Sequence, residues 1–112
     1  MPPLRDADTI EKLRLAFEES SSGGVLWKRH ASDWVRKNLD GCTMSTVNGL
    51  VYEHIVAGGE IDEVEETREG YRHHRFHYDF RLPVTDRRVY VETVLKDGRM
   101  GPIVTVVNIH DA

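Results

Sequence analysis

An alternating segment between Arg72 and Leu82 places ionisable side chains on one face of a predicted strand. The outward set is His73, Arg75, His77, Asp79 and Arg81, and the next alternating segment adds Arg88, Tyr90 and Glu92. If the two segments are antiparallel neighbours, opposite residues lie about 5 Å apart, so some of these side chains must touch. Metal-independent cleavage of RNA needs a base for the 2′-hydroxyl proton, an acid for the leaving oxygen and a cation for the phosphate charge. These residue types can supply all three groups.

Within this set, His77 or Glu92 is the candidate base and another histidine is the candidate acid. Arg75 or Arg81 is the candidate clamp for the phosphate. The alternative is a solvated sheet face held by cross-strand ion pairs, for example between Arg81 and Glu92, because polar outer faces are ordinary in antiparallel sheets. Residue types alone leave both interpretations open.

The run from His73 to His77 is also rich in side chains that could bind a metal ion. On a strand, at about 3.3 Å per residue, these two histidines lie about 13 Å apart. Zinc binds histidine nitrogens at about 2.1 Å, so the pair cannot share one ion. The sequence therefore predicts no metal site, and nothing in it indicates another cofactor.

Other candidate residues lie outside this segment. His30 comes just before a predicted helix, where packing or helix capping is the simpler role. His54 lies on the apolar face of another predicted helix, as a core histidine would, and His110 ends the last predicted strand. Cys42 is the only cysteine, so it cannot form an internal disulfide, and nothing marks it as activated.

Helices are predicted in the first half of the chain. Their ranges are 9–19, started by Asp8 and Glu11 at capping-box spacing, then 32–39, and 45–57. The third has one continuous apolar face, made of Val47, Leu50, Val51, His54 and Ile55. A short apolar run at 25–27 is a further strand candidate.

Strands are predicted after residue 60, where the period changes from 3.6 to 2. Their ranges are 61–66, 71–82, 88–95 and 103–109, with turns at 83–86 and 96–99. Helix 45–57 is expected to lie across one face and to bury Phe76, Phe80, Val89 and Val91. The predicted fold class is α+β, with two or three N-terminal helices packed on one face of a three- to four-stranded antiparallel sheet.

Length and composition fit one folded domain, with 112 residues, 39% of them hydrophobic and 30% charged. We expect a single domain over 1–112, in which 1–22 is a helical extension ahead of the core at 25–110. No apolar run approaches the roughly 20 residues of a membrane span. The first residues lack the apolar stretch of a signal peptide, so the expected location is the cytoplasm.

Charge is distributed unevenly along the chain, although the formal net charge is only −4. Residues 60–70, here called the acidic strip, contain six acids and one base, whereas residues 71–99 contain seven bases and four acids. This balance excludes a generally basic nucleic-acid coat but not a local basic site. The two segments could pair with each other, or the acidic strip could form the rim of an anion site.

Three features carry a resemblance to a known family. His30-Ala31 opens a helix, an amphipathic helix ends at Gly58-Gly59, and a Thr-Val pair, Thr105-Val106, lies near the end. Over roughly residues 25–109 the chain resembles a family of small bacterial domains of unknown function, grouped with the barnase, colicin and RelE-type ribonuclease toxins. The resemblance implies a site formed by the helix-leading histidine and polar residues of the sheet, which match His30, Arg81 and Thr105. The chain departs from that pattern in being acidic and in carrying an extra first helix.

The predicted function is therefore an RNA-directed, toxin-like module acting as a metal-independent ribonuclease. The candidate catalytic residues are His30, His77, Arg81 and Glu92, and the candidate binding residues are Arg75, Tyr90 and Thr105. Candidate partners are RNA and an antitoxin-like or other protein, with no membrane, and the chain could be a monomer or a dimer. The alternative is a non-catalytic protein-interaction domain that uses the open sheet face or the acidic strip. A small-molecule pocket between helix and sheet is a third option, for which no residue argues specifically.

Overall fold

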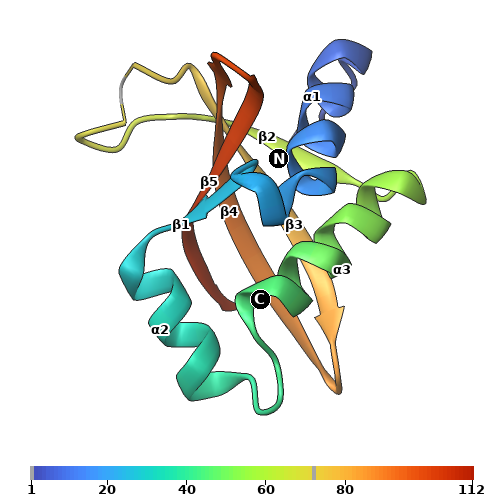
Figure 1. Cartoon of the computed structure of the whole chain (residues 1–112), viewed down its shortest axis with the longest axis vertical. Helices are drawn as coiled ribbons and strands as arrows, with labels where there is room; N and C mark the ends of the chain where they lie inside the picture. The colour runs from blue at the N-terminus through green and yellow to red at the C-terminus, as the bar shows by residue number, and fades with distance from the viewer. Residues whose placement is uncertain (1, 72) are drawn as a thin grey trace.

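Helices precede the long strands of a single sheet in this computed structural model, which describes residues 2–71 and 73–112 (Figure 1). The elements are α1 (Ala7–Glu18), the 3₁₀ turn η1 (Ser20–Ser22), β1 (Val25–Trp27), α2 (Arg29–Asn38), α3 (Met44–Val56), β2 (Ile61–Glu65), β3 (Phe76–Val84), β4 (Arg87–Gly98) and β5 (Gly101–Asp111). In these residues, three α-helices pack on a five-stranded sheet, which confirms the α+β prediction with one strand more than expected. None of the described helices is both long and apolar enough to cross a membrane.

The strand order is β1-β5-β4-β3-β2. The last four strands form an antiparallel meander, as predicted, but β1 pairs with β5 in the parallel direction, with Val25 opposite Val104. Parallel neighbours need a long crossover connection, and here most of the fold separates the two strands in the chain. The four strands predicted after residue 60 thus form the expected antiparallel sheet, and the strand candidate at 25–27 adds a fifth, parallel strand whose partner the hairpin connections did not indicate.

One apolar cluster joins all three helices to the same face of the sheet. Its largest fully buried side chains include Phe80, Leu82 and Ile109 from the strands and Leu13, Val35 and Val51 from the helices. The first helix is therefore part of the core, and Phe17 meets Phe80 edge to face at 5.9 Å between ring centroids. Leu50 and Phe76 are only partly buried, in contrast to the prediction.

Several boundaries differ from the sequence prediction. Helix α1 starts earlier, because Asp6 caps it by accepting a hydrogen bond from the Thr9 amide at 3.0 Å, rather than through Asp8 and Glu11. Strand β3 starts at Phe76, whereas the predicted strand started at residue 71. Of the predicted residues before Phe76, Arg72 lies outside the described part of the chain.

Both turns are shorter than predicted and are centred later in the chain. The β3–β4 turn is formed by Thr85 and Asp86, because Pro83 and Val84 still pair with β4. The β4–β5 turn is Arg99-Met100 rather than 96–99, because pairing continues to Gly98 opposite Gly101. Gly98 serves packing rather than the turn, since a Cβ there would come within 2.5 Å of the Ile103 side chain.

Candidate functional site

A row of polar residues crosses the face of the sheet that points away from the helices, here called the open face. Asp62, Asp79, Glu92 and Asn108 are successive cross-strand neighbours on β2, β3, β4 and β5. Arg81, Tyr90 and His110 form the next row along the strands. Because side chains alternate between faces, these residues lie opposite the buried set that includes Phe80, Val91 and Ile109.

His77 and Tyr90 both bind the Asp79 carboxylate, which is only 1% exposed. Nδ1 of His77 lies 2.7 Å from Oδ1, and the Tyr90 hydroxyl donates to Oδ2 at 2.7 Å. An ionised carboxylate can only accept, so the proton of a neutral His77 resides on Nδ1. Nε2 makes no hydrogen bond to any residue in 2–71 or 73–112. The arrangement fixes the ring and leaves Nε2 as a proton acceptor.

Burial controls the protonation of this group. Desolvation raises the pKa of Asp79, and the hydrogen bonds from His77 and Tyr90 offset part of that rise. Burial, followed by the hydrogen bond to Asp79, raises the pKa of the Tyr90 phenol. Tyr90 is therefore a hydrogen-bond donor at neutral pH and holds the carboxylate in place.

Glu92 is engaged by Arg68, which comes from the loop between β2 and β3. Nη1 of Arg68 donates to Glu92 at 2.9 Å, while Nε and Nη2 donate to the two oxygens of Glu66 at 2.9 and 2.8 Å. The Glu66 side chain is fully buried, and its hydrogen bonds to Arg68 lower its pKa to about 2. We call these three residues the Arg68 clasp. It ties the loop to the sheet and occupies Glu92, which weakens Glu92 as a candidate base.

Arg81 points away from the core, as predicted, but its partner is Asp62 and not Glu92. Nη2 donates to both carboxylate oxygens of Asp62, at 2.9 and 2.7 Å, and Asp62 is only 2% exposed. The cross-strand neighbour of Arg81 is Tyr90, so Glu92 lies one row away. Within the described residues, Nε and Nη1 of Arg81 have no hydrogen-bond partner, and 46% of the side chain is exposed.

His110, which ends the last predicted strand, joins this cluster. Its ring stacks on Tyr90 at 5.2 Å between centroids, and Nε2 lies 3.6 Å from Glu92. Nδ1 lies 2.8 Å from the Asp111 carbonyl oxygen, which can only accept, so Nδ1 carries a proton. The cluster thus contains two histidines that each have Nδ1 fixed by an acceptor.

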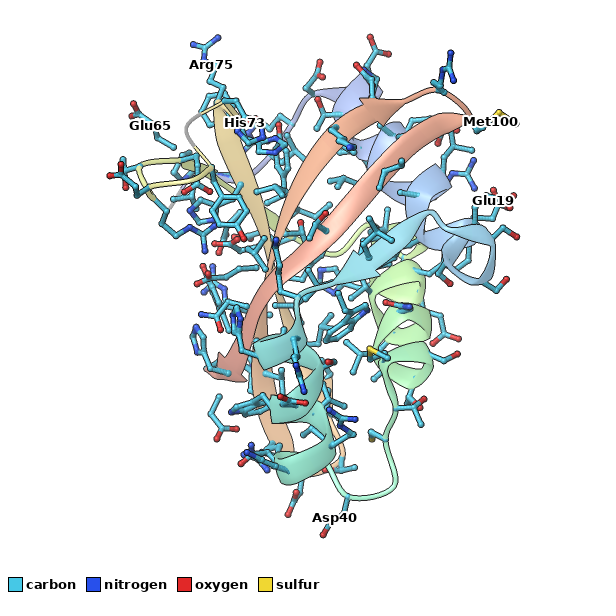
Figure 2. All side chains as sticks on the ribbon, turned by 60° about the vertical axis from the view of Figure 1, so that its left-hand side comes forward. Glu19, Asp40, Glu65, His73, Arg75 and Met100 are labelled. Atoms are coloured by element: carbon cyan, nitrogen blue, oxygen red, sulfur yellow. The ribbon has the colours of Figure 1, made fainter. Side chains whose placement is uncertain are left out.

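The remaining predicted site residues lie apart from this cluster. Arg75 is exposed, precedes the start of β3 and stacks over Phe76. The prediction that it shares the strand face with His77 was therefore wrong. Figure 2 shows Arg75 with His73 near Glu65, at one end of the sheet. His30 is exposed in the first turn of α2. Thr105, on β5, is partly buried and pairs with Val94 of β4. Within the structure as described, none of these three side chains has a hydrogen bond or ion pair to His77, Asp79, Tyr90 or His110.

Sequence reasoning missed Asp62, Glu66 and Arg68. The available signal was weak, because Arg68 is the single base in the acidic strip. The ion pairs of Arg68 with Glu66 and Glu92, and of Arg81 with Asp62, join residues from different strands or from a loop. Residues 2–71 and 73–112 contain no group of three metal-ligating side chains close enough to hold an ion.

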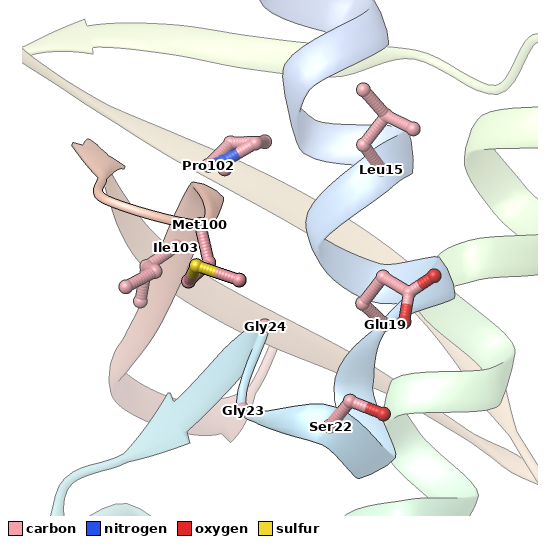
Figure 3. Close-up of a pocket in the computed structure, with 9 residues that line it drawn as sticks. Leu15, Glu19, Ser22, Gly23, Gly24, Met100, Pro102 and Ile103 are labelled. Carbon is pink, nitrogen blue, oxygen red and sulfur yellow. The ribbon is translucent and has the colours of Figure 1, made fainter.

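A hollow of about 470 Å³ lies elsewhere, between the end of α1 and the start of β5 (Figure 3). Its lining residues are Leu15, Glu19, Ser22, Gly23, Gly24, Met100, Gly101, Pro102 and Ile103. It lies between a helix and the sheet, and its lining contains no histidine or arginine. It therefore has no part in the chemistry of the open face.

No family model, curated protein or solved structure matches the chain. The resemblance to the ribonuclease-toxin group stays a prediction, and the function has to be argued from the site.

Proposed function

We propose that this protein is an RNA-directed, metal-independent ribonuclease whose site is on the open sheet face. The observation that carries the proposal is the His77–Asp79 pair. A buried carboxylate holds Nδ1 at 2.7 Å, while Nε2 has no partner among the described residues. A histidine oriented in this way is suited to take a proton from a substrate hydroxyl.

The proposed reaction uses two histidines. His77 Nε2 accepts the 2′-hydroxyl proton as the 2′ oxygen forms a bond to phosphorus. The bond from phosphorus to the 5′ oxygen breaks, and protonated His110 supplies a proton to that leaving oxygen. The products are a 2′,3′-cyclic phosphate and a free 5′-hydroxyl group.

Arg81 is the proposed clamp for the phosphate. Its Nε and Nη1 are available while Nη2 stays on Asp62, and nearly half of the side chain is exposed. Arg68 is less suitable, because its hydrogen bonds already go to Glu66 and Glu92. A guanidinium placed here would stabilise the negative charge that develops on the phosphate oxygens.

The test is cleavage of single-stranded RNA by the purified protein in the presence of EDTA. We expect products that end in a 2′,3′-cyclic phosphate, and His77→Ala should slow cleavage by about 10²-fold or more. The matched control is His73→Ala, because His73 is exposed and lies before the strand. Loss of activity with EDTA, or equal activity in both variants, contradicts the proposal.

One observation favours the alternative, a non-catalytic domain that binds a protein partner through the open face. With neutral histidines, the four carboxylates Asp62, Glu66, Asp79 and Glu92 outnumber the two arginines Arg68 and Arg81 that bind them. The cluster then has a net charge of −2, which favours a basic segment over RNA. Binding of a lysine-rich peptide, without RNA binding at low salt, would support this alternative.

A further inference from the structure

A small hollow opens at the edge of β3, beside the candidate site. It has a volume of about 210 Å³ and is lined by His54, Glu60, Arg81 and Arg88. Strand β2 begins at Ile61, opposite Phe80, so the following residues of β3 have no β2 neighbour. The hollow therefore lies where the edge of β3 is not covered by β2.

Cationic side chains outnumber carboxylates in the lining of this hollow. Arg81 and Arg88 contribute two positive charges and Glu60 one negative charge. The exposed Arg88 has no ion pair or side-chain hydrogen bond to a residue in the described chain. Glu60 comes no nearer than 4.0 Å to Nη2 of Arg81 and is itself exposed. Once Asp62, which binds Arg81, is counted as well, the charges balance. What the hollow offers an anion is therefore the exposed guanidinium of Arg88 and the two nitrogens of Arg81 that do not contact Asp62.

The walls of the hollow are held in place before any ligand binds. Nε2 of His54 lies 2.8 Å from the Glu60 carbonyl oxygen, and the ring meets Phe80 edge to face. Gly59 is needed for this packing, because a Cβ there would lie 2.5 Å from the His54 ring. Arg81 is anchored by Asp62 through Nη2, and in the part of the chain that the structure describes Nε and Nη1 have no partner, so they can bind a ligand.

We propose that this hollow is a phosphate subsite, in which the forked guanidinium groups of Arg81 and Arg88 bind the oxygens of one phosphate group. As far as RNA is concerned, the inference rests on the proposed function. Arg81, which lines the hollow, is two residues from Asp79 along β3, about 7 Å, on the side away from His77. The subsite would take the phosphate next to the one being cleaved, with Arg81 between the two phosphates, so that one of its two remaining nitrogens faces each of them. The preferred substrate is then an RNA strand that continues beyond the cleaved bond, rather than a dinucleotide.

The first experiment uses inorganic phosphate as the probe and does not depend on RNA cleavage. In a titration followed by NMR of the arginine side-chain Nε–Hε groups, the signals of Arg81 and Arg88 should shift together. Arg88→Ala should weaken phosphate binding by about tenfold or more, the loss expected for a hydrogen bond to a charged group. Arg99→Ala is the matched control, since Arg99 is also exposed but lies in the turn at the opposite end of β4. Equal shifts for Arg88 and Arg99, or unchanged binding by Arg88→Ala, would overturn the subsite.

The second experiment compares a tetranucleotide with a dinucleoside monophosphate as RNA substrates. Arg88→Ala should lower kcat/KM for the tetranucleotide by a larger factor than for the dinucleotide, and Arg99→Ala should not change their ratio. If phosphate binds as expected but the wild type cleaves no RNA, the proposed function fails and the anion site stands. If RNA is cleaved but Arg88→Ala affects both substrates equally, the subsite fails and the proposed function stands.

Discussion

The Arg68 clasp should make the stability of this protein depend on the ionisation of one buried glutamate. Glu66 has a pKa of about 2 in the folded protein, against an ordinary value of 4.5. Because its pKa is lowered by folding, Glu66 stabilises the fold above pH 4.5, and that contribution is lost as the pH falls toward 2. At about 1.4 kcal/mol per pH unit, this difference amounts to about 3 kcal/mol in the free energy of unfolding.

Urea unfolding of the wild type, Glu66→Gln and Glu65→Gln over a series from neutral to acid pH measures this contribution. Glu65 is the matched control, since it precedes Glu66 in the chain but is exposed. The raised pKa of Asp79 acts in the opposite sense, because its contribution is present below its ordinary value of 3.8 and lost as the pH rises. That effect is common to all three proteins and cancels in the comparison. Acid should cost the wild type and Glu65→Gln about 3 kcal/mol more than it costs Glu66→Gln. Parallel stability curves for the two variants would refute the reasoning.

Two further predictions concern the core and Arg81. Leu13→Ala should lower the free energy of unfolding by about 2–5 kcal/mol, because Leu13 is fully buried in the apolar cluster. The control is Leu26→Ala, which should cost far less because Leu26 is half exposed. Equal denaturation midpoints for the two variants would show that α1 is not part of the core. Arg81→Ala should weaken RNA binding, measured at low salt, and should also lower stability by about 1–3 kcal/mol, since the buried Asp62 loses its partner. The double variant Arg81→Ala with Asp62→Asn should recover part of that stability, and a single variant as stable as the wild type would contradict the account.

Elements with a clear period could be predicted from the sequence. The alternation from Phe76 to Leu82 placed Phe80 in the core and His77 and Arg81 on the open face, and the structure confirms all three positions. The pairing of β1 could not be predicted, because three apolar residues carry no information about a partner strand that follows about 80 residues later. Its hydrogen bonds depend on how the whole chain folds back.

The contacts within the site were harder to predict than the faces. Alternation tells which side chains share a face, but register decides which of them meet, and a shift of one row separates Arg81 from Glu92. The β4–β5 register also shifts between Glu92 and Thr93, and no feature of the sequence indicated this. Arg68 reaches Glu92 from a loop, so no strand pattern could connect the two.

Pairing between the acidic strip and the basic segment determines which groups remain available for chemistry. Asp62 of the strip binds Arg81 of the basic segment, and Arg68 of the strip binds both Glu66 within the strip and Glu92 of the basic segment. Much of the opposite charge on the open face is therefore neutralised within the protein. Among residues 2–71 and 73–112, these pairs leave Nε2 of His77 and two nitrogens of Arg81 without a hydrogen-bond partner. A solvated face that only balanced charge would not need the ring of His77 to be held by a carboxylate that is itself buried. That buried pair costs desolvation energy, and the proton-transfer role proposed for Nε2 would account for its placement there.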